Sequence, residues 1–575
     1  MSSTAALAAT PDPQVCEQAR LSRDARFDGL FFTAVTSTGI YCRPVCPAPP
    51  PRRENVTYYP NAAAAEAAGF RPCLRCRPEL SPGDDAWRRG DATVARALQL
   101  IDQGVLADEP LAALAQRVGL GERQLRRLFV DRLGAAPLGV HGTRRLLFAK
   151  QLLTETSLPI TEVALAAGFG SLRRFNTSFR EAYRMAPREL RRRPRAASDQ
   201  TLTLRLGYRP PYEFGAMLDF LRTRALPGVE VVDADSYARV VPPPDDTPHA
   251  QPGWLRVSAV ADDGHALQLQ MHGIAPARLL PIVARLRRMF DLDADPQVIA
   301  ATLSADPVLR PLLRHRPGLR LPSGWDGFEI AVRAVLGQQV SVAAARTLAT
   351  RLSQRFGRPL DTPCAPGLDH LFPTPAALAD ADLSTIGLMR ARAGTIRGVA
   401  RAVLDGRVDF NPERTLDDFA ARWVALPGIG PWTAQYIAMR ALGHPDAFPA
   451  EDLVLRRVAA AGDAALTSRA LSARAEAWRP WRAYAVMQLW RKATDDAEAA
   501  AQASRAATRP APLRPPAARD HGPRARPAHG PTEKPDEYDL HHHRKPDRTA
   551  AAGGRRRRPA RGRIPRLAPS GAPRR

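Results

Sequence analysis

The spacing of apolar residues changes along the chain, and each change predicts a different local structure. Between about residues 90 and 192, apolar side chains recur at i, i+3 and i+4, the period of amphipathic helices. Residues 201–318 mix this period with short strand-like runs, and from about 321 to 496 the helical period returns. The strand-like runs are 201–206, 254–258 and 267–270. The pattern therefore predicts a multidomain, mainly α protein with α+β parts.

A helix, a turn containing glycine and a second helix occur twice in the first helical region. Residues 111–119 lead into 122–129, and residues 160–169 lead into 171–179, with a long helix expected near 137–155. The open face of each second helix carries arginine, as in helix-turn-helix proteins that read the DNA major groove. A generic helical bundle is the alternative interpretation. The candidate groove contacts are Arg123, Arg126, Arg127, Arg173, Arg174 and Asn176.

Length and charge indicate several domains and a polyanionic partner. A chain of 575 residues is too long for one core, and its net charge of +25 favours nucleic acid. About half of this charge lies in residues 501–575, a stretch rich in Pro, Ala, Arg and Gly that cannot bury a core. We expect a disordered basic tail, either merely solvated or attracted to DNA non-specifically. Without an 18-residue apolar run or a signal pattern, we expect a cytoplasmic protein with no membrane partner.

Four of the six cysteines form two closely spaced pairs. Cys42 and Cys46 are followed 27 residues later by Cys73 and Cys76, a spacing that can close a tetrahedral thiolate shell around Zn²⁺. A purely structural zinc knuckle is the simplest interpretation of the spacing alone. The surrounding strings at 38–46, 53–56 and 68–76, however, closely resemble the N-terminal domain of the Ada family of bacterial adaptive-response regulators.

The resemblance to Ada implies a chemical role for this quartet. In that family the first cysteine, here Cys42, takes a methyl group from a DNA methylphosphotriester. Zinc keeps a thiol deprotonated, and methylation removes one negative charge, which would strengthen DNA binding after transfer. Arg43 and Arg71 are candidate phosphate contacts, with an ordinary solvated role as the alternative. Cys16 and Cys364 are expected to be ordinary thiols, and the Pro-Cys-His-Arg motif of direct O6-alkylguanine repair is missing from the sequence.

The paired helix-turn-helix pattern, closed by residues 183–187, resembles the AraC-type DNA-binding domain. This resemblance implies promoter DNA as one partner and RNA polymerase as another.

A glycine-rich turn and a carboxylate stand in the second helical region. Residues 426–430 read Leu-Pro-Gly-Ile-Gly, and Asp452 follows 22 residues after Gly430. Gly428 and Gly430 allow a tight turn whose N–H groups can face a phosphate, although such a turn alone would be unspecific. With residues 432–437 and 448–453, the turn matches the helix-hairpin-helix glycosylase signature. Residues 201–496 as a whole resemble the AlkA family of 3-methyladenine DNA glycosylases.

The resemblance to AlkA assigns roles within this region. Asp452 is the expected catalytic carboxylate, because a fixed carboxylate stabilises the oxocarbenium character that develops as the base leaves; its neighbour Glu451 is the competitor. The base pocket is expected to hold Trp432, Tyr436 and Trp490, with core packing as the alternative for the last two. Gln339 stands where the family has the leucine that fills the gap left by the flipped base.

The scarcity of lysine narrows the chemistry. No lysine occurs from 151 to 491, and Trp432 stands where related strand-cleaving enzymes have their Schiff-base lysine, so we expect a monofunctional glycosylase. No cysteine follows Cys364, which excludes an iron–sulfur cluster in the hairpin region. Whether the hairpin holds a monovalent cation is left open.

The sequence thus predicts an alkylation-response protein that joins a methyl sensor and regulator to a glycosylase acting on alkylated double-stranded DNA. Two alternatives remain: a regulator whose glycosylase-like half only recognises damage, and a repair enzyme whose Ada-like half only targets DNA. The expected segments are an N-terminal tail 1–15, a small zinc domain 16–88, an AraC-type double helix-turn-helix domain 89–193, an AlkA-like N-terminal α+β domain 200–318, an all-α helix-hairpin-helix domain 319–497 and a disordered basic tail 498–575.

Overall fold

A computed structural model of the chain describes most residues up to 507. The described residues are 10–83, 91–191, 201–244, 250–260, 264–411, 415–462 and 464–507. All of them belong to the first of two units, Met1–Thr508, and the second unit is Arg509–Arg575. Most of the predicted basic tail therefore lies outside the described residues. Within the described ranges, no helix combines the length and apolar character that a membrane span requires.

The N-terminal segment is built on a small sheet in the order β3-β1-β2-β4. Its strands and helices are α1 (Pro13–Ser22), β1 (Phe32–Val35), β2 (Ile40–Cys42), β3 (Val56–Tyr59), α2 (Ala62–Ala67) and β4 (Arg71–Pro72). Phe32, Ala34 and Tyr41 of the sheet pack against α2 and form its core. Helix α1 begins at Pro13, before the predicted domain start at residue 16, and Asp12 caps it by accepting the Gln14 N–H at 2.7 Å.

The next segment is all helical and contains both predicted helix-turn-helix units. Its helices are α3 (Ala92–Asp102), α4 (Val105–Asp108), α5 (Leu111–Arg117), α6 (Glu122–Leu133), α7 (Pro137–Glu155), α8 (Ile160–Ala166), α9 (Leu172–Tyr183) and α10 (Pro187–Leu190). The central helix α7 spans the predicted range 137–155. The fully buried residues of these helices include Leu125 and Phe129 on α6 and Phe175 and Phe179 on α9. The apolar residues that recur with the helical period therefore form the packed face of each copy.

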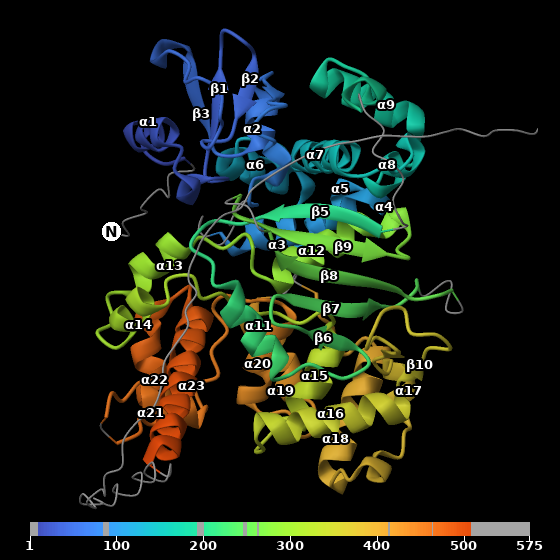
Figure 1. Cartoon of the computed structure of the whole chain (residues 1–575), viewed down its shortest axis with the longest axis vertical. Helices are drawn as coiled ribbons and strands as arrows, with labels where there is room; N and C mark the ends of the chain where they lie inside the picture. Colours follow the sequence, from blue (N-terminus) through green and yellow to red (C-terminus); the bar gives the residue numbers. More distant parts are fainter. Residues whose placement is uncertain are drawn as a thin grey trace, which may run out of the picture. The chain divides into compact units, whose positions relative to one another are not determined.

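A five-stranded antiparallel sheet in the order β5-β9-β8-β7-β6 follows (Figure 1). Its elements are β5 (Thr201–Gly207), α11 (Phe214–Arg222), β6 (Glu230–Val232), β7 (Ser236–Val241), β8 (Gly253–Ala259), β9 (Ala266–His272) and α12 (Leu279–Met289). The three predicted strands are confirmed as β5, β8 and β9. Strand β7 was not predicted. All six of its residues are buried, so its sequence lacks the alternation of apolar and polar residues that marks a half-exposed strand.

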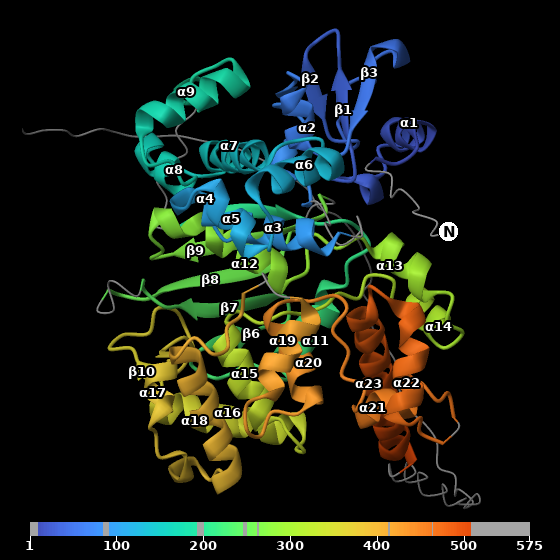
Figure 2. The same cartoon turned by 180° about the vertical axis from the view of Figure 1, so that it is seen from behind.

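The C-terminal segment is a helical domain with the largest apolar core of the described chain. Its helices are α13 (Pro296–Leu303), α14 (Leu309–His315), α15 (Gly327–Leu336), α16 (Val342–Phe356), α17 (Pro375–Ala379), α18 (Arg390–Leu404), α19 (Leu416–Val424), α20 (Pro431–Ala441), α21 (Leu453–Val458), α22 (Ser468–Ala475) and α23 (Arg482–Ala507), with the short strands β10 (Arg358–Pro359) and β11 (His370–Leu371). Figure 2 shows these helices from the opposite side.

The last helix runs past residue 497, the predicted end of the helical domain. Helix α23 continues to Ala507. Residues 497–507 are mostly alanine, which has the highest intrinsic helix propensity. The first residues assigned to the disordered tail therefore extend the last helix.

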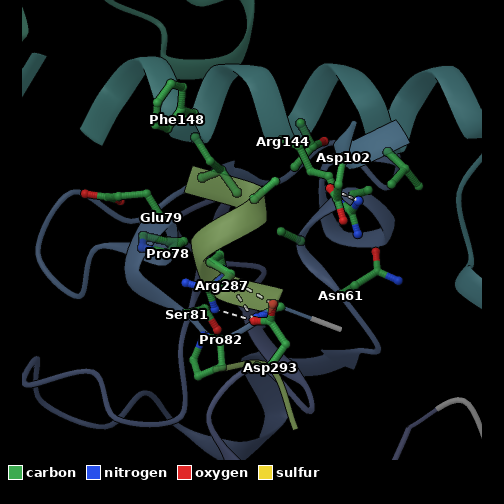
Figure 3. Close-up of a pocket in the computed structure, with 18 of the residues that line it drawn as sticks. Asn61, Pro78, Glu79, Ser81, Pro82, Asp102, Arg144, Phe148, Arg287 and Asp293 are labelled. Carbon is green, nitrogen blue, oxygen red and sulfur yellow. Dashed lines mark hydrogen bonds and ion pairs between the residues drawn. The ribbon is translucent and has the colours of Figure 1, made fainter. Parts of the chain in front are cut away.

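Buried polar contacts join the N-terminal segment to the five-stranded sheet. The Arg209 side chain, with no exposed surface, donates to the Asp28 carbonyl at 2.8 Å and to the Gly83 carbonyl at 2.6 Å. Beside it lies a cavity of about 230 Å³. Figure 3 shows that two arginines on its wall are already paired with carboxylates there, Arg144 with Asp102 and Arg287 with Asp293. The charges of these wall residues therefore balance one another, and the cavity is a packing gap between the segments.

The Arg209 contacts lead to a stability prediction. Replacing Arg209 by alanine leaves buried carbonyl groups without their donor, and we expect the change to cost about 3–5 kcal/mol. Chemical denaturation followed by tryptophan fluorescence measures this cost. The exposed Arg314→Ala variant is the control and should change stability by less than about 0.5 kcal/mol. An Arg209→Ala protein as stable as this control would show that the contact between the segments contributes little.

Candidate functional sites

The four cysteines of the quartet converge on one point of the N-terminal segment. Cys42 ends β2, Cys46 follows a tight turn, and Cys73 and Cys76 follow β4. Their sulfur atoms all lie within 4.8 Å of one another. The parallel pairing of β2 with β4 brings the two halves of the quartet together.

The surroundings of the sulfur atoms fit a zinc–thiolate site. The Arg43 N–H points at the Cys76 sulfur and the Arg75 N–H points at the Cys73 sulfur, both at 3.4 Å. Such backbone donors stabilise negatively charged sulfur, and four thiolates in a tetrahedral cluster are the donor set that structural zinc prefers. The quartet is therefore a Zn²⁺ site.

The four ligands differ in how far solvent can reach them. Cys73 and Cys76 are only 7% and 6% exposed, whereas Cys42 and Cys46 are partly exposed. A cavity of about 630 Å³ is lined by Cys42, Cys46 and Cys73 and by five arginines, Arg20, Arg23, Arg43, Arg71 and Arg75. An anionic group entering this cavity meets positive charge and the two accessible sulfur atoms.

The two arginines expected to contact phosphate differ in their present partners. The Arg43 guanidinium donates to the Asp28 carboxylate, with Nε to Oδ1 at 2.9 Å, and to the Cys76 carbonyl at 3.0 Å. It would have to leave Asp28 to hold a phosphate. The Arg71 side chain is partly exposed and, within the described ranges, has no ion-pair partner, which leaves it available to a ligand.

The other two cysteines lie away from the quartet. Cys16 is fully buried in α1, and this burial raises the pKa of its thiol to about 12. Burial also raises the pKa of Cys364, whose sulfur faces the Leu368 carbonyl at 3.5 Å. A thiol with a raised pKa is a poor nucleophile near neutral pH, so neither cysteine competes chemically with the quartet.

Asp452 and the three predicted pocket aromatics form a second cluster, in the helical domain. Asp452 is the N-cap of α21 and accepts the Leu455 N–H at 3.0 Å. Its other hydrogen bonds come from two indole rings: Trp432 Nε1 lies 3.2 Å from Oδ2, and Trp490 Nε1 lies 3.4 Å from Oδ1. Three donors on three different helices thus fix the orientation of this carboxylate.

The rings make a partly exposed aromatic wall beside Asp452. Trp432 and Tyr436 are stacked, with centroids 5.2 Å apart and planes 14° apart, and Tyr436 lies 6.3 Å from Trp490. Glu451, the competitor for the catalytic role, is exposed. The geometry therefore favours Asp452 as the carboxylate that faces a ligand against this wall.

The glycine turn lies next to α18. Gly428 has φ +84°, and a Cβ added there would lie 2.0 Å from the Thr395 hydroxyl oxygen of α18. Gly430 is the N-cap of α20, the helix that carries Trp432 and Tyr436. The turn thus leads directly into the helix that carries the aromatic wall.

A Gly428→Ala variant should test this packing. Both the positive φ and the contact with Thr395 oppose a Cβ, so we expect a loss of about 2–4 kcal/mol in stability. Thermal unfolding of the purified chain would measure it. Gly430→Ala, where nothing lies within 4 Å of the added Cβ, is the matched control and should cost much less. Equal unfolding temperatures for the two variants would contradict the tight packing described here.

The sequence did not indicate that Gln338 connects the segments of this region. Its side-chain amide donates to the Gly428 carbonyl at 2.9 Å and to the Thr433 hydroxyl at 3.0 Å. The Arg392 guanidinium in turn donates to the Gln338 carbonyl at 2.7 Å. Nothing in the sequence links these positions, since they come from three separate segments. The adjacent Gln339 is exposed and has φ +56°.

The six candidate groove contacts lie on α6 and α9. Arg123, Arg126 and Arg127 are exposed on α6, where Arg126 pairs with Glu122 at 2.5 Å. On α9, Arg173 and Arg174 are exposed and Asn176 is partly exposed. Both second helices therefore present a polar, basic face to solvent.

Comparison with known proteins matches each of these regions to a family. The matching family models are the metal binding domain of Ada at 15–79, a helix-turn-helix domain at 114–193, the AlkA N-terminal domain at 203–326 and the HhH-GPD superfamily of base excision DNA repair proteins at 332–483.

Relatives cover nearly the whole described chain. A probable bifunctional transcriptional activator/DNA repair enzyme AlkA of Mycobacterium tuberculosis is 41% identical over 491 residues, which are 83% of this chain and 96% of the relative. DNA-3-methyladenine glycosylase 2 of Escherichia coli is 34% identical, over 50% of this chain and 95% of the relative. The bifunctional transcriptional activator/DNA repair enzyme Ada of Escherichia coli is 38% identical, over 26% of this chain and 41% of the relative.

These matches define a fusion of an Ada-type zinc domain and an AraC-type helix-turn-helix domain with an AlkA-type glycosylase domain. The chain belongs to the family of bifunctional transcriptional activator/DNA repair enzymes AlkA.

Proposed function

We propose that this chain answers DNA alkylation twice, by accepting a methyl group on Cys42 and by excising alkylated purines, of the 3-methyladenine type, with Asp452. The observation that carries the second activity is the carboxylate held by two indoles beside an aromatic wall. The first is supported by a partly exposed ligand sulfur next to a basic cavity. Damaged DNA is the common substrate.

Methyl acceptance is a displacement at carbon. When bound by Cys42, Cys46, Cys73 and Cys76, Zn²⁺ keeps the sulfur atoms deprotonated. The Cys42 sulfur attacks the methyl carbon of a methylphosphotriester with its electron pair, an S–C bond forms, and the C–O bond breaks with its electrons going to oxygen. The products are a methyl thioether and an ordinary phosphodiester anion. Because no group removes the methyl, each chain reacts once.

Arg71 and its neighbours supply the electrostatic part of this reaction. Guanidinium groups around the cavity attract the flanking phosphates and stabilise the negative charge that develops on the leaving phosphodiester oxygen. Of the two arginines considered above, Arg71 suits this role without rearrangement, whereas Arg43 supports the quartet through Asp28 and the Cys76 carbonyl.

Base excision is hydrolysis of the C1′–N bond. The damaged nucleotide leaves the stack, and its base lies against Trp432, Tyr436 and Trp490, whose π-faces attract the positive charge of many alkylated purines. The C1′–N bond breaks with its electron pair going to the base, and Asp452 stabilises the positive sugar. Water adds to C1′ and loses one proton, which leaves a free base and an abasic site.

The reaction stops at the abasic site. A lyase needs a nucleophilic amine to form a Schiff base with C1′, and Trp432 stands at that position. No lysine occurs between 151 and 491, and the amine of Lys492 on α23 is paired with the Asp496 carboxylate.

Regulation is the proposed role of the remaining domain. Transfer of a methyl group makes the zinc site less negative, which favours DNA binding by residues 16–88. We propose that 89–193 then holds promoter DNA through α6 and α9, using Arg123, Arg127, Arg173, Arg174 and Asn176, and that RNA polymerase is the downstream partner. Arg126 contributes once it leaves Glu122. We assign base excision to residues 200–497 together with the C-terminal turns of α23.

The test of the proposed function is the product set made by the full chain. Duplex DNA carrying one 3-methyladenine analogue and an end label is incubated with the protein, and the strand is analysed before and after alkali. We expect free base and an intact strand that alkali then cleaves. Strand cleavage without alkali, or a borohydride-trapped protein–DNA adduct, would overturn the monofunctional mechanism. Binding without any base release would favour a role in damage recognition alone.

A further inference from the structure

Exposed apolar side chains gather near the glycine turn. Val340, Val342 and Met389 are 36%, 45% and 68% exposed, and Met389 is the most exposed large apolar residue of the described chain. Val340 and Val342 flank the start of α16, and Met389 immediately precedes α18. A single exposed apolar residue is common at a protein surface, whereas a cluster of exposed apolar residues is typical of an interaction surface.

Hydrogen bonds hold the two loops that carry these residues against the turn. Arg392, in the first turn of α18, donates to the Gln338 carbonyl at 2.7 Å. The Gln338 side chain donates to the Gly428 carbonyl at 2.9 Å. The loop at 338–342, the N-terminus of α18 and the glycine turn are therefore one connected surface. We call its exposed members Gln339, Val340 and Met389 the wedge surface.

Two members of the wedge surface break local structural rules. Gln339 adopts φ +56°, a left-handed conformation that side chains other than glycine rarely adopt. Met389 is the N-cap of α18 but forms no side-chain capping bond, although Ser, Thr, Asp or Asn would stabilise the helix there. Departures of this kind are frequent at functional sites, and here two of them fall within the exposed apolar cluster.

We propose that Met389 is the principal apolar wedge that enters the base stack when the damaged nucleotide turns out of the duplex, with Val340 packing beside it. This inference rests on the proposed excision function and deepens it. A flexible, polarisable methionine can fill a gap between base pairs, and apolar wedges of this kind unstack base steps. Gln339 lacks a fully apolar side chain, so it lines the gap and offers hydrogen bonds to the facing base edge.

The experiment compares Met389→Ala with Met389→Leu and with Leu404→Ala. Leu404 is 54% exposed at the opposite end of α18, which makes it the matched control. Single-turnover base release is measured on a duplex and on the same lesion in a single strand. We expect Met389→Ala to slow duplex release about tenfold, the effect of losing one buried apolar side chain, and to leave single-strand release unchanged. Met389→Leu and Leu404→Ala should match the wild type.

Fluorescence of 2-aminopurine beside the lesion separates the wedge from the chemistry. 2-Aminopurine fluoresces more strongly when it is unstacked. Its fluorescence is recorded in an Asp452→Asn background, where the damaged base is not released. Met389→Ala should abolish most of the rise that the Asp452→Asn protein gives. An unchanged rise, a duplex rate within twofold of wild type, or equal losses on duplex and single strand would overturn the wedge assignment. If the wild-type chain releases no base while the rise still depends on Met389, the excision proposal fails and the wedge assignment stands.

Discussion

Replacing Asp452 by asparagine is expected to lower the single-turnover rate of purine release by about a thousandfold or more. The carboxylate stabilises a positive sugar in the transition state, and loss of one such fixed electrostatic group costs on the order of 10²–10³ in rate, with the loss of water orientation adding to it. Asparagine keeps the size of the side chain and an oxygen for the Leu455 N–H. The fold should therefore survive, while one indole donor loses its acceptor.

The neighbouring Glu451→Gln variant is the control for this measurement. Glu451 is exposed and lies one residue from the site, so its neutralisation should change the rate by less than about twofold. Free base is quantified by chromatography at saturating protein. If Asp452→Asn releases purine at the wild-type rate, or if Glu451→Gln is the inactive variant, the assigned carboxylate is wrong.

Replacing Cys42 by alanine is expected to abolish methyl uptake, from one methyl group per chain to none. The variant lacks the accepting sulfur and one of four metal ligands, so zinc binding should also weaken. Transfer of isotope-labelled methyl from alkylated DNA to protein measures the uptake, and mass spectrometry measures the zinc. Purine release should continue, because no hydrogen bond or ion pair of the described residues joins the Asp452 cluster to the quartet.

Cys364→Ala is the matched control for the acceptor. Cys364 is a partly exposed thiol outside the quartet, and its loss should leave the uptake at one methyl group per chain. Peptide mapping of the wild-type protein should place the label on Cys42. Label on Cys46, the other partly exposed ligand, would reassign the acceptor within the same site.

The residues of both sites could be predicted where they lie close to one another in the sequence. The quartet is two pairs of cysteines, each within five residues, and the parallel pairing of β2 with β4 brings the two pairs together. The helix-turn-helix copies are likewise local, because glycine turns and a 3.6 period define them without distant contacts. The start of α7 follows from Pro137 at the first helical position.

Contacts between distant segments could not be predicted in the same way. The sequence places Trp490 38 residues beyond Asp452, and nothing in its spacing says that its indole N–H reaches that carboxylate. The pairing of Arg43 with Asp28 and the burial of Arg209 depend on how segments pack. Strand β7 is buried on both faces, which removes the alternating pattern, and alanine in α23 suits a helix as well as a tail.

The central claim is that one chain carries two separable responses to alkylated DNA. The most direct test measures released purine and protein-bound methyl in the same reaction, for the wild type, Asp452→Asn and Cys42→Ala. The wild type should give both products, Asp452→Asn only the methylated protein, and Cys42→Ala only the free purine. Purine release by Asp452→Asn at the wild-type rate, or undiminished methyl uptake by Cys42→Ala, would contradict the account.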